Sequence, residues 1–304
     1  MNEDTKRVWI SEDRGDLEGK TVVITGGNSG IGYETARALS ACNANVIIAC
    51  RDNLKCSTAL NQIRSESSKG RMTAMHLDLA NLSSVLDFTD KFKSEYKELH
   101  LLINNAGLMW TPFSLTKDGF EMQFGVNHLG HFALTGLLLD RLLNTSGARV
   151  VTVSSLAHWL SRLTHADTPW HPEKYNRYKA YFDSKLANLL FARQLGRLAE
   201  RHGNELISVA VHPGYSATNL QRNYAIARFA NTFLAQSMEM GALPTLRAAT
   251  DPDAASGDYF GPDKFMGFRG FPVRARSSKR SKDTILADVL WENSEQLSGV
   301  AYRF

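Results

Sequence analysis

The sequence predicts an α/β protein in which helices cover both faces of one mostly parallel sheet. Six short runs rich in β-branched residues are typical of strands: residues 21–25, 45–50, 72–77, 101–104, 149–154 and 206–211. They are nearly continuous apolar segments, the pattern of parallel strands that are buried on both faces. Longer amphipathic segments separate them, and this alternation favours right-handed crossovers and a doubly wound sheet.

The amphipathic segments predict helices at residues 31–41, 54–65, 82–96, 119–143 and 173–201. After the sixth strand the alternation stops, because residues 215–252 show helical patches without a strand and residues 258–260 predict only a short last strand. Neither a repeat nor a low-complexity linker divides the chain, so we expect one domain over residues 1–304. Within it, residues 1–16 form an N-terminal tail and residues 219–304 a substrate-side segment and C-terminal extension.

Composition excludes several classes of protein. With 304 residues and 43% hydrophobic content the chain can bury a substantial core. The net charge of +4 is small, and charges of both signs are interspersed outside residues 269–282, which argues against a nucleic-acid binder. We expect that basic stretch, with Arg274, Arg276, Lys279 and Arg280, to be a solvated loop rather than a surface for an acidic partner.

Cysteine usage and hydropathy indicate a cytoplasmic protein. The three cysteines, Cys42, Cys50 and Cys56, cannot all pair within the chain, and two of them lie in apolar segments where a buried thiol acts as a small hydrophobe. This favours a reducing compartment. Neither the first twenty residues nor any later segment is apolar for long enough to predict a secretory signal or a transmembrane segment.

A glycine-rich segment at residues 25–32 follows the first predicted strand and leads directly into a helix. Gly26 allows a tight turn, Gly30 lets backbone N–H groups approach a pyrophosphate, and Gly32 permits close packing of the helix against the strand. A glycine-rich string can also be an ordinary loop. Its position between a strand and a helix favours a dinucleotide-binding site.

The end of the second strand indicates which dinucleotide binds. Residues 49–51 lack the carboxylate that bonds the adenosine ribose hydroxyls in NAD-preferring proteins. Arg51 is placed to pair with a 2′-phosphate and to stack on adenine, and Lys55 lies one helical turn further on. Both could instead be solvated surface cations. The pattern predicts NADP(H).

Tyr181 and Lys185 form a Y-x-x-x-K pattern within the predicted helix at 173–201, so their side chains share one helix face. A free tyrosine has a pKa of about 10 and exchanges protons poorly near neutral pH. An ammonium at ~4 Å favours the phenolate by roughly 4 kcal/mol at an effective dielectric near 20, about three pKa units. The spacing is common on surface helices, so only its context makes it a catalytic candidate.

These features together resemble the short-chain dehydrogenase/reductase family, whose motifs occur here in the family's order. The loop at 25–32 is similar to its T-G-x-x-x-G-x-G motif, and segments 78–79, 104–107 and 212–214 to its adenine contact, N-N-A-G motif and P-G motif. The resemblance implies a Rossmann-type domain. The expected cofactor-binding residues are Gly26, Asn28, Ser29, Gly30, Ile31, Gly32, Arg51, Lys55, Asp78, Leu79, Asn105, Ala106, Gly107, Tyr181, Lys185, Pro213, Gly214 and Thr218.

The resemblance also implies a catalytic tetrad of Asn127, Ser155, Tyr181 and Lys185. Ser155 is the second of two serines that end the fifth strand; Ser154 is expected to support the strand end. Tyr181 would exchange a proton with the substrate oxygen, and Ser155 would hydrogen-bond the same oxygen. Lys185 would hold the nicotinamide ribose and lower the pKa of Tyr181, and Asn127 would anchor a water chain.

Residues around this tetrad indicate a branch and a substrate class. Segments 155–158 and 184–188 and the extended tail resemble the retinol dehydrogenase, WW-domain oxidoreductase and protochlorophyllide reductase branch. The 25 residues between Ser155 and Tyr181 are expected to roof the pocket. Large aromatic and sulfur-bearing residues near the pocket predict an apolar, bulky or elongated substrate. The candidate lining residues are Met109, Trp110, His158, Trp159, Trp170, Phe229, Phe233, Met238 and Met240.

The main prediction is therefore an NADP(H)-dependent oxidoreductase that interconverts a carbonyl and an alcohol on a small molecule. Two alternatives remain: a non-catalytic NADP-binding redox sensor, and an epimerase-type reaction on the same scaffold. No metal site is expected, because no cysteine or carboxylate completes a ligand pattern with the histidines at 128, 131, 158, 165 and 171. Physiological substrate, reaction direction and oligomeric state stay open; many family members form homodimers through helices corresponding to 119–143 and 173–201, and single-chain relatives exist.

Overall fold

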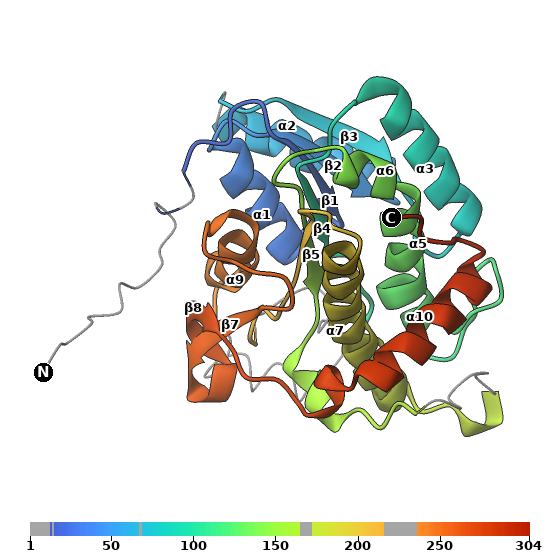
Figure 1. The fold of residues 1–304 in the computed structure, drawn as a ribbon. Helices are drawn as coiled ribbons and strands as arrows, with labels where there is room; N and C mark the ends of the chain where they lie inside the picture. Colours follow the sequence, from blue (N-terminus) through green and yellow to red (C-terminus); the bar gives the residue numbers. More distant parts are fainter. Residues whose placement is uncertain (1–12, 14, 67–68, 165–171, 216–235) are drawn as a thin grey trace, which may run out of the picture.

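One eight-stranded sheet lies at the centre of the molecule, with helices on both of its faces (Figure 1). The computed structural model describes residues 13, 15–66, 69–164, 172–215 and 236–304. The strand order is β3-β2-β1-β4-β5-β6-β7-β8, with β8 antiparallel to β7 and every other neighbouring pair parallel. The strands are β1 Thr21–Thr25, β2 Asn45–Cys50, β3 Met72–His76, β4 Leu101–Asn104, β5 Arg149–Val153, β6 Ile207–Val211, β7 Tyr259–Lys264 and β8 Arg269–Arg274.

The helices cover the sheet in two layers because alternate strand residues point to opposite faces. Val22 and Ile24 of β1 pack with α1, α2 and α9, whereas Val23 packs with α3, α5 and α7. The helices are α1 Gly30–Ser40, α2 Asn53–Glu66, α3 Leu82–Glu95, α4 Met122–Phe124, α5 Gly130–Leu137, α6 Leu139–Leu143, α7 Arg177–Arg201, α9 Met238–Thr250 and α10 Thr284–Ser298. In the part of the chain just described, none is long and apolar enough to cross a bilayer.

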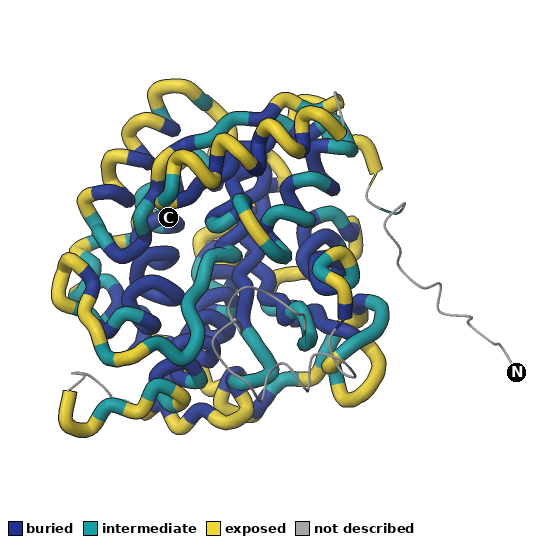
Figure 2. Tube along the Cα trace, turned by 180° about the vertical axis from the view of Figure 1, so that it is seen from behind, coloured by how far each residue is buried: buried dark blue, intermediate teal, exposed yellow. Residues whose placement is uncertain are grey.

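Burial follows the pattern that predicted the sheet. Figure 2 shows buried residues along the strands and the inner sides of the helices, with exposed residues on the outer turns. All five residues of β1 and all five of β5 are buried. The predicted doubly wound parallel sheet is therefore confirmed.

Two elements differ from the sequence prediction. The single helix expected at 119–143 is interrupted by a π-helical turn, η2 Gly125–Leu129, and by a break at Leu138 between α5 and α6. Part of the expected basic loop is the antiparallel edge strand β8, which the sequence prediction missed because Gly270 and Pro272 disguise it. Proline is tolerated on an edge strand, where its missing N–H costs no ladder bond.

The cysteines also differ from expectation. Cys50 at the end of β2 and Cys56 in α2 are joined in a disulfide, with Cα atoms 6.2 Å apart, and Cys42 is a free thiol. The sequence analysis expected thiols in a reducing compartment, with no disulfide among them. The tight connection between β2 and α2 brings two of them together.

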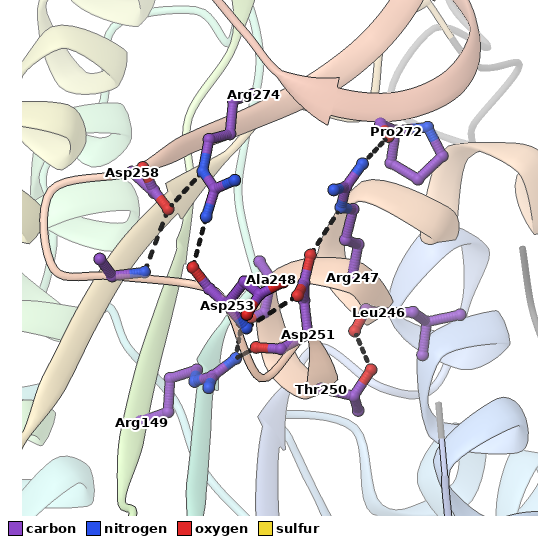
Figure 3. A network of polar contacts seen from close by, with 11 residues as sticks. Arg149, Leu246, Arg247, Ala248, Thr250, Asp251, Asp253, Asp258, Pro272 and Arg274 are labelled. Carbon is purple, nitrogen blue, oxygen red and sulfur yellow. Dashed lines mark hydrogen bonds and ion pairs between the residues drawn. The ribbon is translucent and has the colours of Figure 1, made fainter. Parts of the chain in front are cut away.

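A network of polar contacts fastens the C-terminal elements to the sheet (Figure 3). Arg149, at the start of β5 and 7% exposed, donates to the carbonyl oxygens of Ala248 (2.7 Å) and Asp251 (3.0 Å) at the end of α9. Arg247 pairs with Asp251 at 2.9 Å and donates to a carbonyl of β8. The guanidinium of Arg149 thus donates to carbonyl groups at a helix C-terminus that have no partner within the helix, and positive charge is favourable there.

We expect Arg149→Leu to lower the free energy of unfolding by about 1–3 kcal/mol, because the α9 carbonyls would lose their buried donor. Urea denaturation would measure the change. Arg201→Leu, at the exposed last turn of α7, is the matched control and should change stability by less than about 0.5 kcal/mol. Equal losses in the two variants would contradict the proposed anchoring.

Candidate active site

The predicted site residues gather where the parallel strands end. The glycine loop follows β1, the N-N-A-G segment follows β4, Ser155 follows β5 and the P-G segment follows β6. The strand order reverses between β1 and β4. Ligands of open α/β sheets bind at this edge and at this switch point.

The glycine loop presents an unblocked helix N-terminus. Ser29 is the N-cap residue of α1 but makes no side-chain capping bond, and the first turn carries no acidic residue. Gly26 and Gly30 have φ angles of +66° and +58°, which favour glycine. A Cβ atom at Gly32 would collide with the carbonyl oxygen of Gly26 and the amide of Asn105. The free N–H groups of α1 are therefore available to an anion such as a pyrophosphate.

A buried threonine joins this loop to the end of β4. The Thr25 hydroxyl accepts hydrogen bonds from the backbone N–H groups of Asn105 (2.9 Å) and Ala106 (3.0 Å). The Asn105 side-chain amide donates in return to the Thr25 carbonyl at 2.8 Å. These bonds fix the spacing between two segments expected to hold the cofactor.

His131 extends the connection to Asn127, and the sequence analysis missed this role. Its Nδ1 lies 3.0 Å from the Asn127 carbonyl oxygen and its Nε2 2.8 Å from the Thr25 hydroxyl. Because a carbonyl only accepts, Nδ1 carries the hydrogen and Nε2 accepts from Thr25. Burial lowers the pKa of His131 to about 4, so the ring stays neutral. The spacing in the sequence could have predicted this contact, because a histidine four residues after Asn127 on a helix can bond the Asn127 carbonyl.

Asn127 is fully buried in η2 and holds the turn after β4. Its Oδ1 accepts from the Leu108 N–H (2.7 Å), and its Nδ2 donates to the Leu108 carbonyl (2.9 Å) and to the Ser184 hydroxyl (2.9 Å). A Cβ atom at Gly107 would lie 3.2 Å from the Asn127 Oδ1 and 3.5 Å from the Lys185 Nζ. In this structure protein groups engage both polar atoms of the Asn127 amide, so the side chain positions the segment at 107–108.

Tyr181 and Lys185 lie one turn apart on α7, and both are buried. The Lys185 Nζ is 5.7 Å from the centroid of the Tyr181 ring and donates to the Val153 carbonyl at 3.2 Å. Burial raises the pKa of Tyr181, opposed by a hydrogen bond with Ser155, and lowers the pKa of Lys185 to about 8. Desolvation therefore outweighs the stabilisation of the phenolate by the ammonium that the sequence analysis expects.

Ser155 ends β5 and caps the short 3₁₀ helix η3 Leu156–Leu160. Its hydroxyl oxygen accepts from the Ala157 N–H at 3.1 Å and contacts the phenol of Tyr181. Ser154 instead donates to the Lys185 carbonyl at 2.6 Å. The structure thus turns one serine of the pair toward the phenol and uses the other to hold α7.

His158 holds the backbone of Ser155 and does not cover a pocket. It is buried; its Nδ1 donates to the Ser155 carbonyl (2.7 Å) and its Nε2 accepts from the Ser278 N–H (3.1 Å). Burial lowers the pKa of His158. Trp159 is half exposed, and Trp170 lies outside the described residues.

At the adenosine end, Arg51 is exposed directly after β2, with no carboxylate of the described residues within ion-pair distance. Asp52, which the sequence analysis did not consider, accepts from the Lys55 backbone N–H (3.1 Å) and pairs with the Lys55 Nζ (3.1 Å). Asp52 thus engages the second predicted cation. Asp78 follows β3 and accepts from the Ala80 N–H at 3.0 Å, which fixes the turn containing Leu79.

The P-G segment is bound to the C-terminal hairpin. Gly214 has a φ of +70°, and a Cβ atom there would collide with the Phe268 carbonyl oxygen. Gln236 donates to the Pro213 carbonyl at 2.7 Å and was missed by the sequence analysis. Thr218, Phe229 and Phe233 lie outside the described residues.

Aromatic side chains line the segment that follows Gly107. The rings of Trp110 and Tyr178 meet edge to face, with centroids 5.1 Å apart. The Gln123 side chain accepts from the backbone N–H of Trp110 (2.7 Å) and donates to the Tyr175 hydroxyl (2.8 Å). The Tyr175 hydroxyl in turn donates to the buried carboxylate of Glu121 (3.0 Å). Burial raises the pKa of Glu121. Within the described residues, no group of three His, Cys, Asp or Glu side chains is placed to hold a metal ion.

Comparisons with known proteins agree with this arrangement. The family model for short chain dehydrogenases matches residues 20–228. Human retinol dehydrogenase 13 is 40% identical over 295 residues, covering 93% of this chain and 86% of the relative. Retinol dehydrogenase 12 of Mus musculus is 41% identical over 291 residues, covering 94% and 88%.

Solved structures share the fold. The crystal structure of an uncharacterised protein from Mycobacterium paratuberculosis is 42% identical, with a TM-score of 0.83, covering 98% of this chain and 100% of that one. A Pseudomonas aeruginosa RhlG complex with NADP is 23% identical, with a TM-score of 0.65, covering 80% and 94%. The second similarity concerns the fold alone.

Lys185→Met should leave the protein at least as stable as the original at pH 7, because it removes a buried ammonium whose pKa falls from 10.5 to about 8. The Val153 carbonyl keeps the Asn188 donor at 3.0 Å. The stability of the original chain rises between pH 8 and 10.5, where the unfolded state binds more protons than the folded state. The advantage of the variant should therefore shrink by pH 10.

Thermal unfolding at pH 7 and pH 10 measures this difference. Lys91→Met, at an exposed position of α3, is the control and should show the same offset at both pH values. An offset for Lys185→Met that grows toward pH 10 would show that burial does not destabilise the ammonium.

Proposed function

Because the chain belongs to the short-chain dehydrogenase family, we propose that it is an NADP(H)-dependent oxidoreductase interconverting a carbonyl and an alcohol on a small apolar molecule. The observation that carries the proposal is the contact of buried Tyr181 with Ser155, beside Lys185 and at the sheet edge that also holds the glycine loop. Carbonyl reduction needs a proton donor and a hydrogen-bond donor at the carbonyl oxygen, and a helix end that binds the pyrophosphate of the cofactor.

The proposed mechanism assigns one step to each side chain. The bound nicotinamide supplies or accepts the hydride. Tyr181 donates its proton to the carbonyl oxygen in reduction, and its raised pKa keeps the phenol protonated at neutral pH. The Ser155 hydroxyl bonds the same oxygen, and Lys185, with a pKa of about 8, remains an ammonium below that pH and can hold a ribose hydroxyl.

Three features of the adenosine end support NADP(H) over NAD(H). No carboxylate stands at positions 49–51, and Arg51 is exposed there. The nearest acid, Asp52, is engaged by the backbone and side chain of Lys55, so it is poorly placed to bond ribose hydroxyls. A guanidinium can bond a 2′-phosphate through two parallel N–H groups.

The substrate class rests on the aromatic wall and on the relatives. Trp110 and Tyr178 give the approach to the site an apolar surface. Retinol, in the names of two relatives about 40% identical to this chain, is an elongated apolar alcohol. Retinoids and long-chain aldehydes are therefore the first substrates to test.

The alternative of a non-catalytic NADP-binding sensor is tested by the same panel. All four tetrad residues are present, which favours turnover. NADPH binding without oxidation across aldehydes, ketones and retinoids would favour the sensor. Turnover of any member of the panel would reject it.

Tyr181→Phe should lower kcat about 10²- to 10⁴-fold while NADPH still binds, because it removes only the hydroxyl that donates the proton. Loss of nicotinamide absorbance measures turnover, and fluorescence of the reduced cofactor measures binding. Tyr96→Phe, which follows α3 at the edge of the sheet opposite the site, is the control and should keep near-normal turnover. Nearly full turnover by Tyr181→Phe would overturn the assigned role.

Arg51→Ala should reduce the preference for NADPH over NADH roughly 10- to 100-fold, the loss expected for one hydrogen-bonded ion pair. The ratio of kcat/KM for the two cofactors measures it. Arg71→Ala, an exposed arginine directly before β3, should leave that ratio unchanged. An unchanged ratio in Arg51→Ala would show that Arg51 does not select the cofactor.

A further inference from the structure

A cavity of about 420 Å³ lies apart from the residues assigned to catalysis and to the cofactor. It is formed by η3, one residue of α7, the start of β7, the end of β8 and the segment that leads toward α10. The side chains important here are Trp159, Arg193, Arg274, Arg276, Ser277 and Lys282. The volume falls within the range of small-molecule sites, about 300–1,000 Å³.

The lining of this cavity carries an excess of positive charge. Four cations line it, and the one carboxylate among the lining residues is Asp258. Asp258 pairs with Arg274 at 2.9 Å. Among the described residues, no carboxylate pairs with Arg193, Arg276 or Lys282, so three positive charges face the cavity uncompensated. Such a cluster attracts anions.

Arg193 gives the cavity a rigid cationic floor. Its guanidinium donates to the Ser281 carbonyl (2.6 Å), the Ser281 hydroxyl (2.7 Å) and the Ser277 hydroxyl (2.9 Å), all of them neutral groups. Burial lowers the pKa of Arg193. A partly buried cation whose partners are neutral is stabilised further by an anion in contact with it.

The walls are held in place before any ligand binds. The Ser278 N–H donates to His158, and the Ser281 hydroxyl donates to the Ser278 carbonyl at 2.7 Å. The ring of Tyr259, which also lines the cavity, is 2% exposed and packs against the ring of His158, with centroids 5.5 Å apart. Trp159 leaves 51% of its surface open. A preformed cationic cavity with an exposed indole has the features of a ligand site.

We propose that this cavity binds a small organic polyanion, a molecule with two or more phosphate or carboxylate groups. Arg276 and Lys282 bind the anionic groups, Arg193 adds positive charge from the floor of the cavity, and Trp159 contacts the remainder of the molecule. Guanidinium groups suit both oxyanions because they bond two oxygens at once. This inference is independent of the proposed oxidoreductase activity.

The test is a titration of the full chain with pyrophosphate and with citrate, which represent the phosphate and carboxylate classes. Calorimetry measures binding, and tryptophan fluorescence reports on Trp159, with Trp159→Phe to assign the signal. Titrations with and without saturating NADP⁺ separate this cavity from the glycine loop. We expect saturable binding of at least one probe with a Kd below about 1 mM that persists with NADP⁺ present.

Charge-removing variants locate the binding. Arg276→Gln and Lys282→Gln change exposed side chains, and each should weaken binding about 3-fold or more, the double variant about 10-fold or more. Lys279→Gln is the matched control, since this exposed cation of the same segment does not line the cavity. Unaltered NADPH binding in all four variants would show that the fold is intact.

Three results would overturn the proposal. They are the absence of saturable binding by both probes, binding that NADP⁺ abolishes, and binding that the double variant leaves unchanged. Sedimentation with phosphatidylserine vesicles, in a protein that binds neither pyrophosphate nor citrate, would assign the cations to a lipid surface and would also reject a small soluble ligand.

Discussion

The candidate active site depends on the pairing of polar groups that are buried where the strands end. The Thr25 hydroxyl is inaccessible to water, accepts from two backbone N–H groups after β4 and donates to His131, which donates to the Asn127 carbonyl. An unpaired buried polar group costs about 1–3 kcal/mol, so displacing one member disturbs the others. This chain holds the glycine loop, the end of β4 and the π-helical turn in one fixed arrangement.

Burial that fixes the geometry also sets the electrostatics. It raises the pKa of Tyr181 and lowers the pKa of Lys185, in both cases because the charged form is desolvated. A phenol kept protonated at neutral pH is a competent proton donor to a carbonyl oxygen, whereas taking a proton from an alcohol requires the phenolate.

Local patterns in the sequence predicted the sheet and the positions of the motifs. Continuous apolar runs marked β1 to β6, and motif segments that follow strand ends must meet at one edge. The sequence did not reveal partners that depend on tertiary contacts: His131 bonds Thr25 and Gln236 bonds Pro213 only through the fold. The pairing of Asp52 with Lys55 is local, three residues apart, and could have been predicted. Strand β8 was missed because its glycine and proline conceal an edge strand that exists only through pairing with β7.

The C-terminal region also contacts the site through His158 of η3. His158 donates to the carbonyl of Ser155 and accepts from the N–H of Ser278, so its tautomer is fixed by a partner on each side. Protonation would remove the acceptor for Ser278, and burial, which lowers the pKa of His158, opposes it. Segment 275–282, which contains Ser278, forms a wall of the cationic cavity through Ala275, Arg276, Ser277 and Lys282. The serine proposed to bind the substrate oxygen is therefore positioned by the same wall that frames this cavity.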